Sequence, residues 1–187
     1  MAVDVLEEHV LSRRGTTVAL GSLALVVSSM VWAPAGQAGT LGDGAGTCAG
    51  NAHSRYDPPL TLVPRATRNH ADVRYTCTSG LGRTVAATGS FDAFAPSASC
   101  VSLSGAGGTE TVRYADGSRS LIVIDGATTA RVAGVLVVLQ SGRVVEGRGE
   151  DHFVRRTVTS LPHQLPTDCL TSGLQGTQSA VQLEILP

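Results

Sequence analysis

The feature that most constrains the fold of this chain is a series of short β-branched runs, separated by turn residues about every ten positions. The runs cover residues 60–63, 72–78, 83–94, 109–114, 120–124, 134–139, 144–149, 153–159 and 180–186. No stretch between them shows the apolar period of an amphipathic helix of three turns. The pattern predicts an all-β fold, either an antiparallel β-sandwich or a small barrel of about eight strands.

Turn residues and hydrophobic periodicity add detail to this prediction. An Asp-Gly pair within residues 115–118 lies between two β-favouring runs and predicts a hairpin, and residues 140–143 predict a second one. Residues 135–139 are apolar at every position, which predicts a central strand covered on both faces. Residues 181–185 alternate apolar and polar side chains, so one face of that strand should contact water.

The amino terminus has the pattern of a secretory signal peptide. Arg13 and Arg14 precede an apolar run at residues 18–33, and small residues follow at 36–38. The apolar run is shorter than the ~20 residues that a membrane-spanning helix needs, although a retained anchor is the alternative. We therefore expect residues 1–38 to be removed and the protein to be secreted, with no membrane attachment after cleavage.

Charge excludes some partners. Every basic residue of the chain is an arginine, and cleavage would remove Asp4, Glu7, Glu8, Arg13 and Arg14, leaving 12 acidic and 12 basic residues. A formally neutral domain has no net positive field to gather phosphate groups. We therefore expect no nucleic-acid partner.

Four cysteines lie in the predicted mature part, at Cys48, Cys77, Cys100 and Cys169. An even number in an exported chain favours two disulfides, and three pairings are possible. We prefer the sequential pairing Cys48–Cys77 with Cys100–Cys169. A zinc site is the alternative, but the chain has no Cys-x-x-Cys and its histidines lack ligand spacing, so no metal is predicted.

Catalytic patterns are weak. Residues 46–50 have the outline of a nucleophile elbow with cysteine at its centre, but no helix pattern follows, so a disulfide cysteine is favoured. Glu146, Glu150, Asp151 and His152 could form the acid–base site of a hydrolase that acts on cell wall or polysaccharide, although a solvated loop is the commoner outcome. We predict no catalytic residue and no cofactor.

Several short motifs together resemble a group of known proteins. They are Cys48-Ala-Gly50, Tyr56-Asp-Pro-Pro-Leu60-Thr61, Tyr75-Thr-Cys77, Ser99-Cys100, Tyr114-Ala-Asp-Gly117, Gly142-Arg-Val-Val-Glu-Gly147 and a closing Cys169. The chain resembles small exported disulfide-bonded β proteins of high-GC Gram-positive bacteria, some of which are similar to the adaptor subunit of umbrella toxin particles. That adaptor family links a lectin-bearing protein to the stalk of a large secreted toxin.

The resemblance implies a non-enzymatic module with a mobile N-terminal segment that inserts into the cleft of a partner. The segment comprises Gly39, Thr40, Leu41, Gly42, Asp43, Gly44, Ala45 and Gly46. The predicted organisation is then a Gly-rich flexible segment at residues 39–47 and one β domain at residues 48–187. An ordinary flexible terminus is the alternative interpretation of the same residues.

The leading functional hypothesis is a secreted interaction module, with other secreted proteins as partners and open strand edges as their contact sites. A second hypothesis is an inhibitor of extracellular proteases, with residues 160–166 as the inhibitory loop. The hydrolase described above is a third.

Overall fold

The structure is a computed structural model, and it describes residues 44–79, 82–132, 135–160 and 167–187. The secondary-structure elements are β1 (Gly46–Leu60), β2 (Arg65–Ser79), β3 (Thr84–Ala98), β4 (Leu103–Ser104), β5 (Gly107–Tyr114), β6 (Arg119–Val132), β7 (Val135–Gly147), β8 (Phe153–Ser160), α1 (Thr167–Leu170) and β9 (Leu174–Leu186). The predicted signal peptide and residues 39–43 lie outside the described residues.

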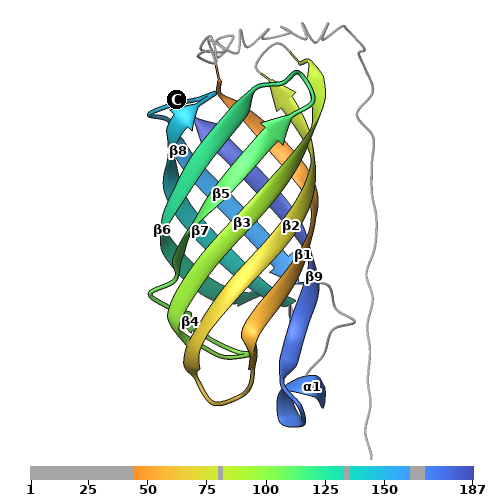
Figure 1. Ribbon diagram of the computed structural model, residues 1–187, viewed down its shortest axis with the longest axis vertical. Helices are drawn as coiled ribbons and strands as arrows, with labels where there is room; N and C mark the ends of the chain where they lie inside the picture. The colour runs from red at the N-terminus through yellow and green to blue at the C-terminus, as the bar shows by residue number, and fades with distance from the viewer. Residues whose placement is uncertain (1–43, 80–81, 133–134, 161–166) are drawn as a thin grey trace, which may run out of the picture. The chain divides into compact units, whose positions relative to one another are not determined.

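The described strands form one antiparallel sheet that closes into a barrel (Figure 1). Eight strands make the barrel in the order β2-β1-β9-β8-β7-β6-β5-β3, and β3 pairs with β2 to complete the circle. The short β4 is an additional strand that pairs with the end of β3. The all-β prediction is confirmed, and of its two forms the small barrel is the one observed.

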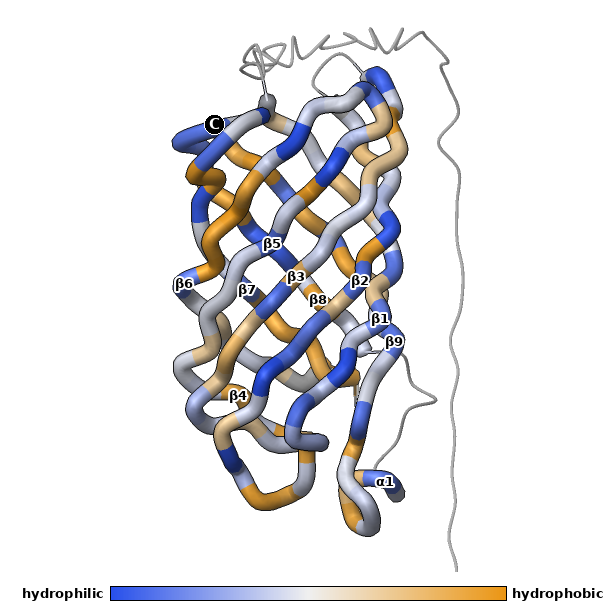
Figure 2. Tube along the Cα trace, viewed as in Figure 1, coloured by the Kyte–Doolittle hydropathy of each residue, from blue (hydrophilic) through white to orange (hydrophobic). Residues whose placement is uncertain are grey.

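Successive side chains of a strand point to opposite faces, which divides them into an inner and an outer set, and Figure 2 shows how hydropathy changes from residue to residue along the strands. In β9, Val181, Leu183 and Ile185 are buried inside the barrel, whereas Gln182 is exposed. The prediction that one face of this strand contacts water is confirmed. In β7 the prediction of two covered faces was too strong, because Leu139 points outward and exposes 43% of its surface.

The hairpin predicted at residues 115–118 is confirmed as the connection between β5 and β6. The Tyr114 N–H donates to the Ser118 carbonyl oxygen at 2.9 Å. Asp116 Oδ1 accepts hydrogen bonds from the Ser118 N–H and hydroxyl, and Gly117 takes a φ of 87°, which the turn requires and glycine adopts without strain.

Two sequence-based predictions of local structure were wrong. Residues 140–143 do not turn, because β7 runs through them without a break and pairs with β6 on one side and β8 on the other. Residues 61–63 are not a strand, since β1 ends at Leu60 and they belong to the connection to β2. Ladder hydrogen bonds on both sides of β7 outweigh the turn preference of Ser141 and Gly142.

Strand β1 was largely missed by the sequence analysis. It is rich in Gly, Ala, Asn, Ser and Pro, residues with low β-propensity. In the barrel it pairs with β2 and with β9 along most of its length, so that neighbours distant in the sequence satisfy its backbone groups. Pairing on both edges therefore decides the conformation of this segment.

Both predicted disulfides are present. Cys48 and Cys77 face each other on β1 and β2, with Cα atoms 3.9 Å apart. Cys100–Cys169 joins the segment after β3 to α1, with Cα atoms 6.3 Å apart. Two such bonds indicate an oxidising compartment outside the cytoplasm. Within the described ranges, no helix has the length and apolarity to span a membrane.

The two ends of the barrel are built differently. One end carries Gly44 and Ala45, the β5–β6 turn and the β7–β8 loop at residues 148–152; we call it the closed end. The other carries the β1–β2 connection, β4 and α1, and we call it the cavity end. In Figure 1 the closed end is uppermost.

Candidate functional site

The size of the inward side chains changes along the barrel. Large side chains fill the middle and the closed end, namely Tyr75, Phe91, Tyr114, Ile122, Ile124, Val144 and Leu183. Toward the cavity end many of the inward positions are small, namely Ala52, Ser54, Ala93, Ala95, Ala98, Ser160 and Ser179. Because eight strands enclose a nearly constant width, small residues at one end leave space there.

That space is a cavity of about 120 Å³. Its apolar wall includes Leu60, Phe91, Leu136, Val138 and Val158, in addition to the alanines. Its polar wall includes Tyr56, Asn69, Gln140 and Arg156, together with several serine and threonine hydroxyls. Phe94 lines the cavity and is 51% exposed, which places it between the cavity and solvent.

A pair of opposite charges lies inside the barrel where the large side chains give way to the small ones. Glu110 on β5 is 0% exposed and Arg156 on β8 is 2% exposed. Arg156 Nε lies 3.0 Å from Glu110 Oε2 and forms an ion pair with it. Arg156 Nη1 also donates to Gln140 Oε1 at 2.6 Å. The single positive charge that lines the cavity is therefore already balanced, as far as the described residues show.

Aromatic side chains complete this buried network. The guanidinium of Arg156 stacks over the ring of Phe91, 4.5 Å from its centre. The Tyr75 hydroxyl donates to Glu110 Oε1 at 2.8 Å. Burial, followed by the charge of Glu110, raises the pKa of Tyr75 far above its ordinary value, so the hydroxyl stays protonated. Burial is the largest single effect on the pKa of Arg156 and lowers it, but the electrostatic interactions and hydrogen bonds with Glu110 and Tyr75 together raise that pKa overall, so the guanidinium stays charged.

Two further polar side chains belong to the cavity end. The Tyr56 hydroxyl is 2.9 Å from Thr177 Oγ1, and burial raises the pKa of Tyr56. Asn69 lies on the inward row of β2 between Thr67 and Ala71. Its Oδ1 atom is buried and accepts no hydrogen bond from the described residues. A buried acceptor without a donor is uncommon in native proteins and marks a position where a ligand can supply one.

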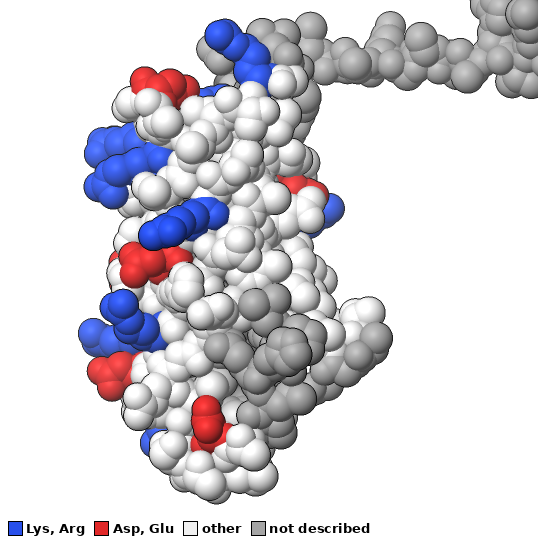
Figure 3. Space-filling view, turned by 90° about the vertical axis from the view of Figure 1, so that its right-hand side faces the viewer, with Lys and Arg blue, Asp and Glu red and all other residues white. Residues whose placement is uncertain are grey.

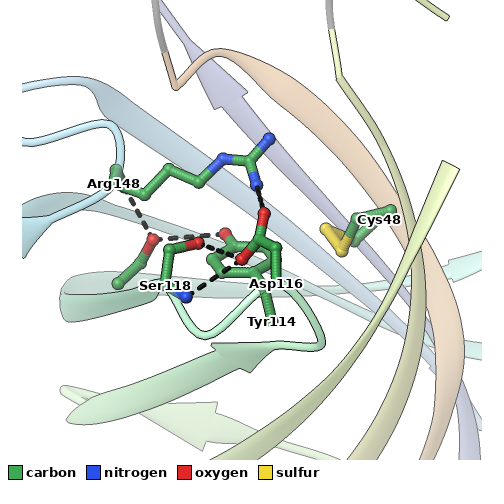
Figure 4. Close-up of polar contacts among 7 residues, drawn as sticks. Cys48, Tyr114, Asp116, Ser118 and Arg148 are labelled. Carbon is green, nitrogen blue, oxygen red and sulfur yellow. Dashed lines mark hydrogen bonds and ion pairs between the residues drawn. A yellow bond between two sulfur atoms is a disulfide. The ribbon is translucent and has the colours of Figure 1, made fainter. Parts of the chain in front are cut away.

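The closed end is sealed by contacts among its loops (Figure 4). The Arg148 guanidinium lies over the Tyr114 ring at 4.7 Å and forms an ion pair with Asp116 at 3.2 Å. The Ser120 hydroxyl donates to the Arg148 carbonyl oxygen at 2.6 Å and is 3.2 Å from the Tyr114 hydroxyl. These contacts fasten the β7–β8 loop over the interior, so the cavity is confined to the opposite end.

The predicted partner-binding segment is described only in part. Residues 39–43 lie outside the described residues. Ala45 is 2% exposed, and Gly46 begins β1, where it pairs with Ser79 and Ile185. The described part of the segment thus belongs to the closed end, while insertion into a partner stays a prediction.

The residues proposed for a hydrolase also lie toward the closed end. Glu146 forms an ion pair with Arg119 on the outer face of the barrel. Glu150, Asp151 and His152 belong to the β7–β8 loop, where His152 Nδ1 is 3.1 Å from the Glu150 carbonyl oxygen. Of these four, none lines the cavity. In the part of the chain that the structure describes, no group of three His, Cys, Asp or Glu could hold a metal ion.

The remaining sequence-based candidates are placed as follows. Cys48, the centre of the nucleophile-elbow outline, is bonded to Cys77 and is not a free thiol. Residues 161–166 of the predicted inhibitory loop lie outside the described residues, and Ser160 ends β8 and lines the cavity. On the face shown in Figure 3, basic and acidic side chains are interspersed along one side, and neither sign forms a separate patch.

The sequence analysis missed Glu110, Asn69 and Arg156, although a signal for Arg156 was present. Arg156 is in phase with Val154 and Val158 on β8, so alternation places a charge among inward apolar residues. An Arg at such a position requires an acidic partner inside the barrel. Glu110 carries the same signal, because it is in phase with Val112 and Tyr114 on β5.

Comparison of the chain with known protein families, with curated proteins and with solved structures gave no match. The resemblance to small exported adaptors therefore stays a prediction from the motifs alone.

Proposed function

We propose that the mature domain binds one small molecule inside the cavity end of the barrel. The observation that carries this proposal is the cavity of about 120 Å³, formed where inward positions on several strands are alanine or serine. Barrels of eight strands are wide enough either to be filled by side chains or to hold one small ligand. This barrel combines both arrangements, because its closed end is filled.

The presence of such a space supports binding over a mere packing defect. Protein interiors are close-packed and contain few voids larger than a water molecule. Most of the cavity wall is apolar, so a ligand with an apolar surface would remove that part of the wall from contact with water.

The compartment fits the proposal. The two disulfides and the predicted leader favour a site of action outside the cell, where the domain would meet small molecules in its surroundings.

The secreted interaction module stays a separate proposal. Closure of the sheet removes most of the open edges on which it relied, because every barrel strand of the described chain has a neighbour on both sides, although residues 126–132 of β6 pair only with β7.

The test is a titration of the protein with benzene, followed by two-dimensional NMR. We expect saturable shifts at cavity residues such as Ala95 and Val158, and none at the closed end. Ala95→Leu should fill the cavity and abolish binding, because Ala95 is buried and lines it. Ala49→Leu, the same substitution on the exposed outer face of β1, is the matched control and should bind normally.

Failure to observe any saturable shift at cavity residues with either benzene or phenol, up to millimolar concentration, would sink the proposal. Binding that survives Ala95→Leu would place the ligand elsewhere on the barrel.

A further inference from the structure

The size of the cavity limits its ligand to a few non-hydrogen atoms. An engineered cavity of about 150 Å³ in another protein binds benzene. The present cavity, at about 120 Å³, is of the same order, so a ligand built on a single ring or a short branched chain matches its size.

The charges inside the barrel favour an uncharged ligand. Arg156 is the charged residue that lines the cavity, and its guanidinium already pairs with Glu110 at 3.0 Å. An anionic ligand beside Arg156 would add a second negative charge close to Glu110, which is fully buried. A cationic ligand would meet the positive guanidinium itself. Either ion would lose its hydration without gaining an unpaired counter-charge, which is unfavourable.

One wall residue indicates what the ligand must carry. Asn69 is among the residues that line the cavity, and its Oδ1 atom is buried and accepts no hydrogen bond from the described residues. A ligand with an O–H or N–H group at this position would supply the missing donor. The rest of the polar wall adapts to such a ligand, because the hydroxyls of Ser54, Ser160 and Ser179 can either donate or accept.

From these observations we infer that the ligand is a small uncharged molecule, about one ring in size, whose hydroxyl or N–H group donates a hydrogen bond to Asn69 Oδ1. The inference rests on the proposed function and names the class of molecule bound at the same site. Simple phenols and cyclic or branched alcohols belong to this class.

The experiment compares phenol with fluorobenzene, which has nearly the same shape but no donor. In the unmodified protein, phenol should bind about 3- to 10-fold more tightly, the range expected for one hydrogen bond to a buried acceptor. In Asn69→Leu this preference should fall to about 1-fold, because the apolar side chain leaves no acceptor. The matched control is Asn51→Leu, an outward position on β1, which should keep the preference.

A comparison of benzoate with benzamide tests whether the cavity favours an uncharged ligand over an anion of similar shape. We expect benzamide to bind at least about tenfold more tightly than benzoate, because the two differ chiefly in charge. Tighter binding of benzoate would overturn the uncharged class and would make Arg156 an anion site.

The outcomes separate the two proposals. Equal binding of phenol and fluorobenzene, or a preference that persists in Asn69→Leu, overturns the donor inference while ligand binding itself stands. If none of the four probes binds at the cavity, both proposals fail. If Asn69→Leu does not fold, the ratio of phenol to fluorobenzene affinity in the unmodified protein decides alone.

Discussion

Glu110 and Arg156 place one charge of each sign inside the barrel, at positions where most inward residues are apolar. Desolvation of such a pair is costly, and the attraction between the partners offsets this cost only when both are present. Glu110 Oε1 accepts a hydrogen bond from Tyr75, and Arg156 Nη1 donates one to Gln140. The pair therefore makes the stability of the fold sensitive to the loss of either charge.

Replacing Arg156 by Met should lower the free energy of unfolding by about 3–5 kcal/mol, because Glu110 would be left buried without a counter-charge. The double variant Glu110→Gln with Arg156→Met should recover at least half of that loss, since no unpaired charge remains. Urea unfolding of both variants measures the two values. Arg155→Met, an outward and exposed neighbour, should cost less than about 1 kcal/mol. If Arg156→Met cost no more than this control, the ion pair would not matter to stability.

His70 provides a pH-dependent contribution on the outer surface. Its Nδ1 is 2.7 Å from Asp92 Oδ1, and its Nε2 is 3.6 Å from Asp72. The hydrogen bond to Asp92 raises the pKa of His70 above 6.5, and the charge of nearby Arg55 acts weakly in the opposite direction. A raised pKa in the folded state means stabilisation that is complete below pH 6.5 and is lost as the pH rises through the folded value.

We expect His70→Asn to lower the free energy of unfolding by about 0.2–1 kcal/mol at about pH 5.5 and to have no effect at about pH 8.5. Denaturant unfolding at both values measures this difference, and an NMR titration of the imidazole locates the pKa. Asp92→Asn should return that pKa toward 6.5, because it removes the charge-assisted partner. An effect that grew with pH would contradict the assignment.

At the scale of the strands, the sequence predicted a strand correctly where apolar and polar residues alternate. It failed where the residues favour a turn or a loop but strand pairing holds them in the sheet. Residues 181–185 alternate cleanly, and β9 follows them. Residues 140–143 have turn-forming composition, yet they lie inside β7, because β6 and β8 satisfy their backbone groups. The polar, Pro-containing β1 is a strand for the same reason.

Gly142 explains why a segment with the composition of a turn lies inside strand β7. A Cβ atom built on Gly142 would lie 2.0 Å from the Val123 carbonyl oxygen on β6, so only glycine permits the close approach of these strands. Gly142→Ala should therefore destabilise the barrel by about 1–3 kcal/mol, measured by thermal or urea unfolding. Ser141→Ala, the adjacent outward position, should change stability by less than about 0.5 kcal/mol. Equal effects of the two substitutions would refute this explanation.

At the scale of the whole molecule, the disulfides stabilise different parts of the barrel. Cys48–Cys77 joins strands that are already hydrogen-bonded neighbours, whereas Cys100–Cys169 attaches α1 across a sequence separation of 69 residues. On the chain-entropy model, removing either bond costs about 3–4.5 kcal/mol. The two removals should destabilise different parts of the barrel.

Replacing Cys100 and Cys169 by Ser should speed amide hydrogen exchange at Thr171, whose N–H donates to the Asp168 carbonyl oxygen at the end of α1. Exchange in the middle of the barrel, for example at Leu183, should stay slow. The corresponding change at Cys48 and Cys77 should leave exchange at Thr171 unaltered. Unchanged exchange at Thr171 in the first variant would show that α1 is held by other contacts.

The sequence by itself determined the all-β class, the β5–β6 hairpin, the alternation of β9 and the expectation that four cysteines form two disulfides, whereas the structure decided which cysteines pair. These features are local or depend on residue type and order, so periodicity, turn chemistry and cysteine count encode them. Only the tertiary structure decided that the sheet closes into a barrel, that β1 is a strand and that Glu110 meets Arg156. The cavity is also of this kind, because small residues scattered along the sequence leave space only when strand register brings them to the same end of the barrel.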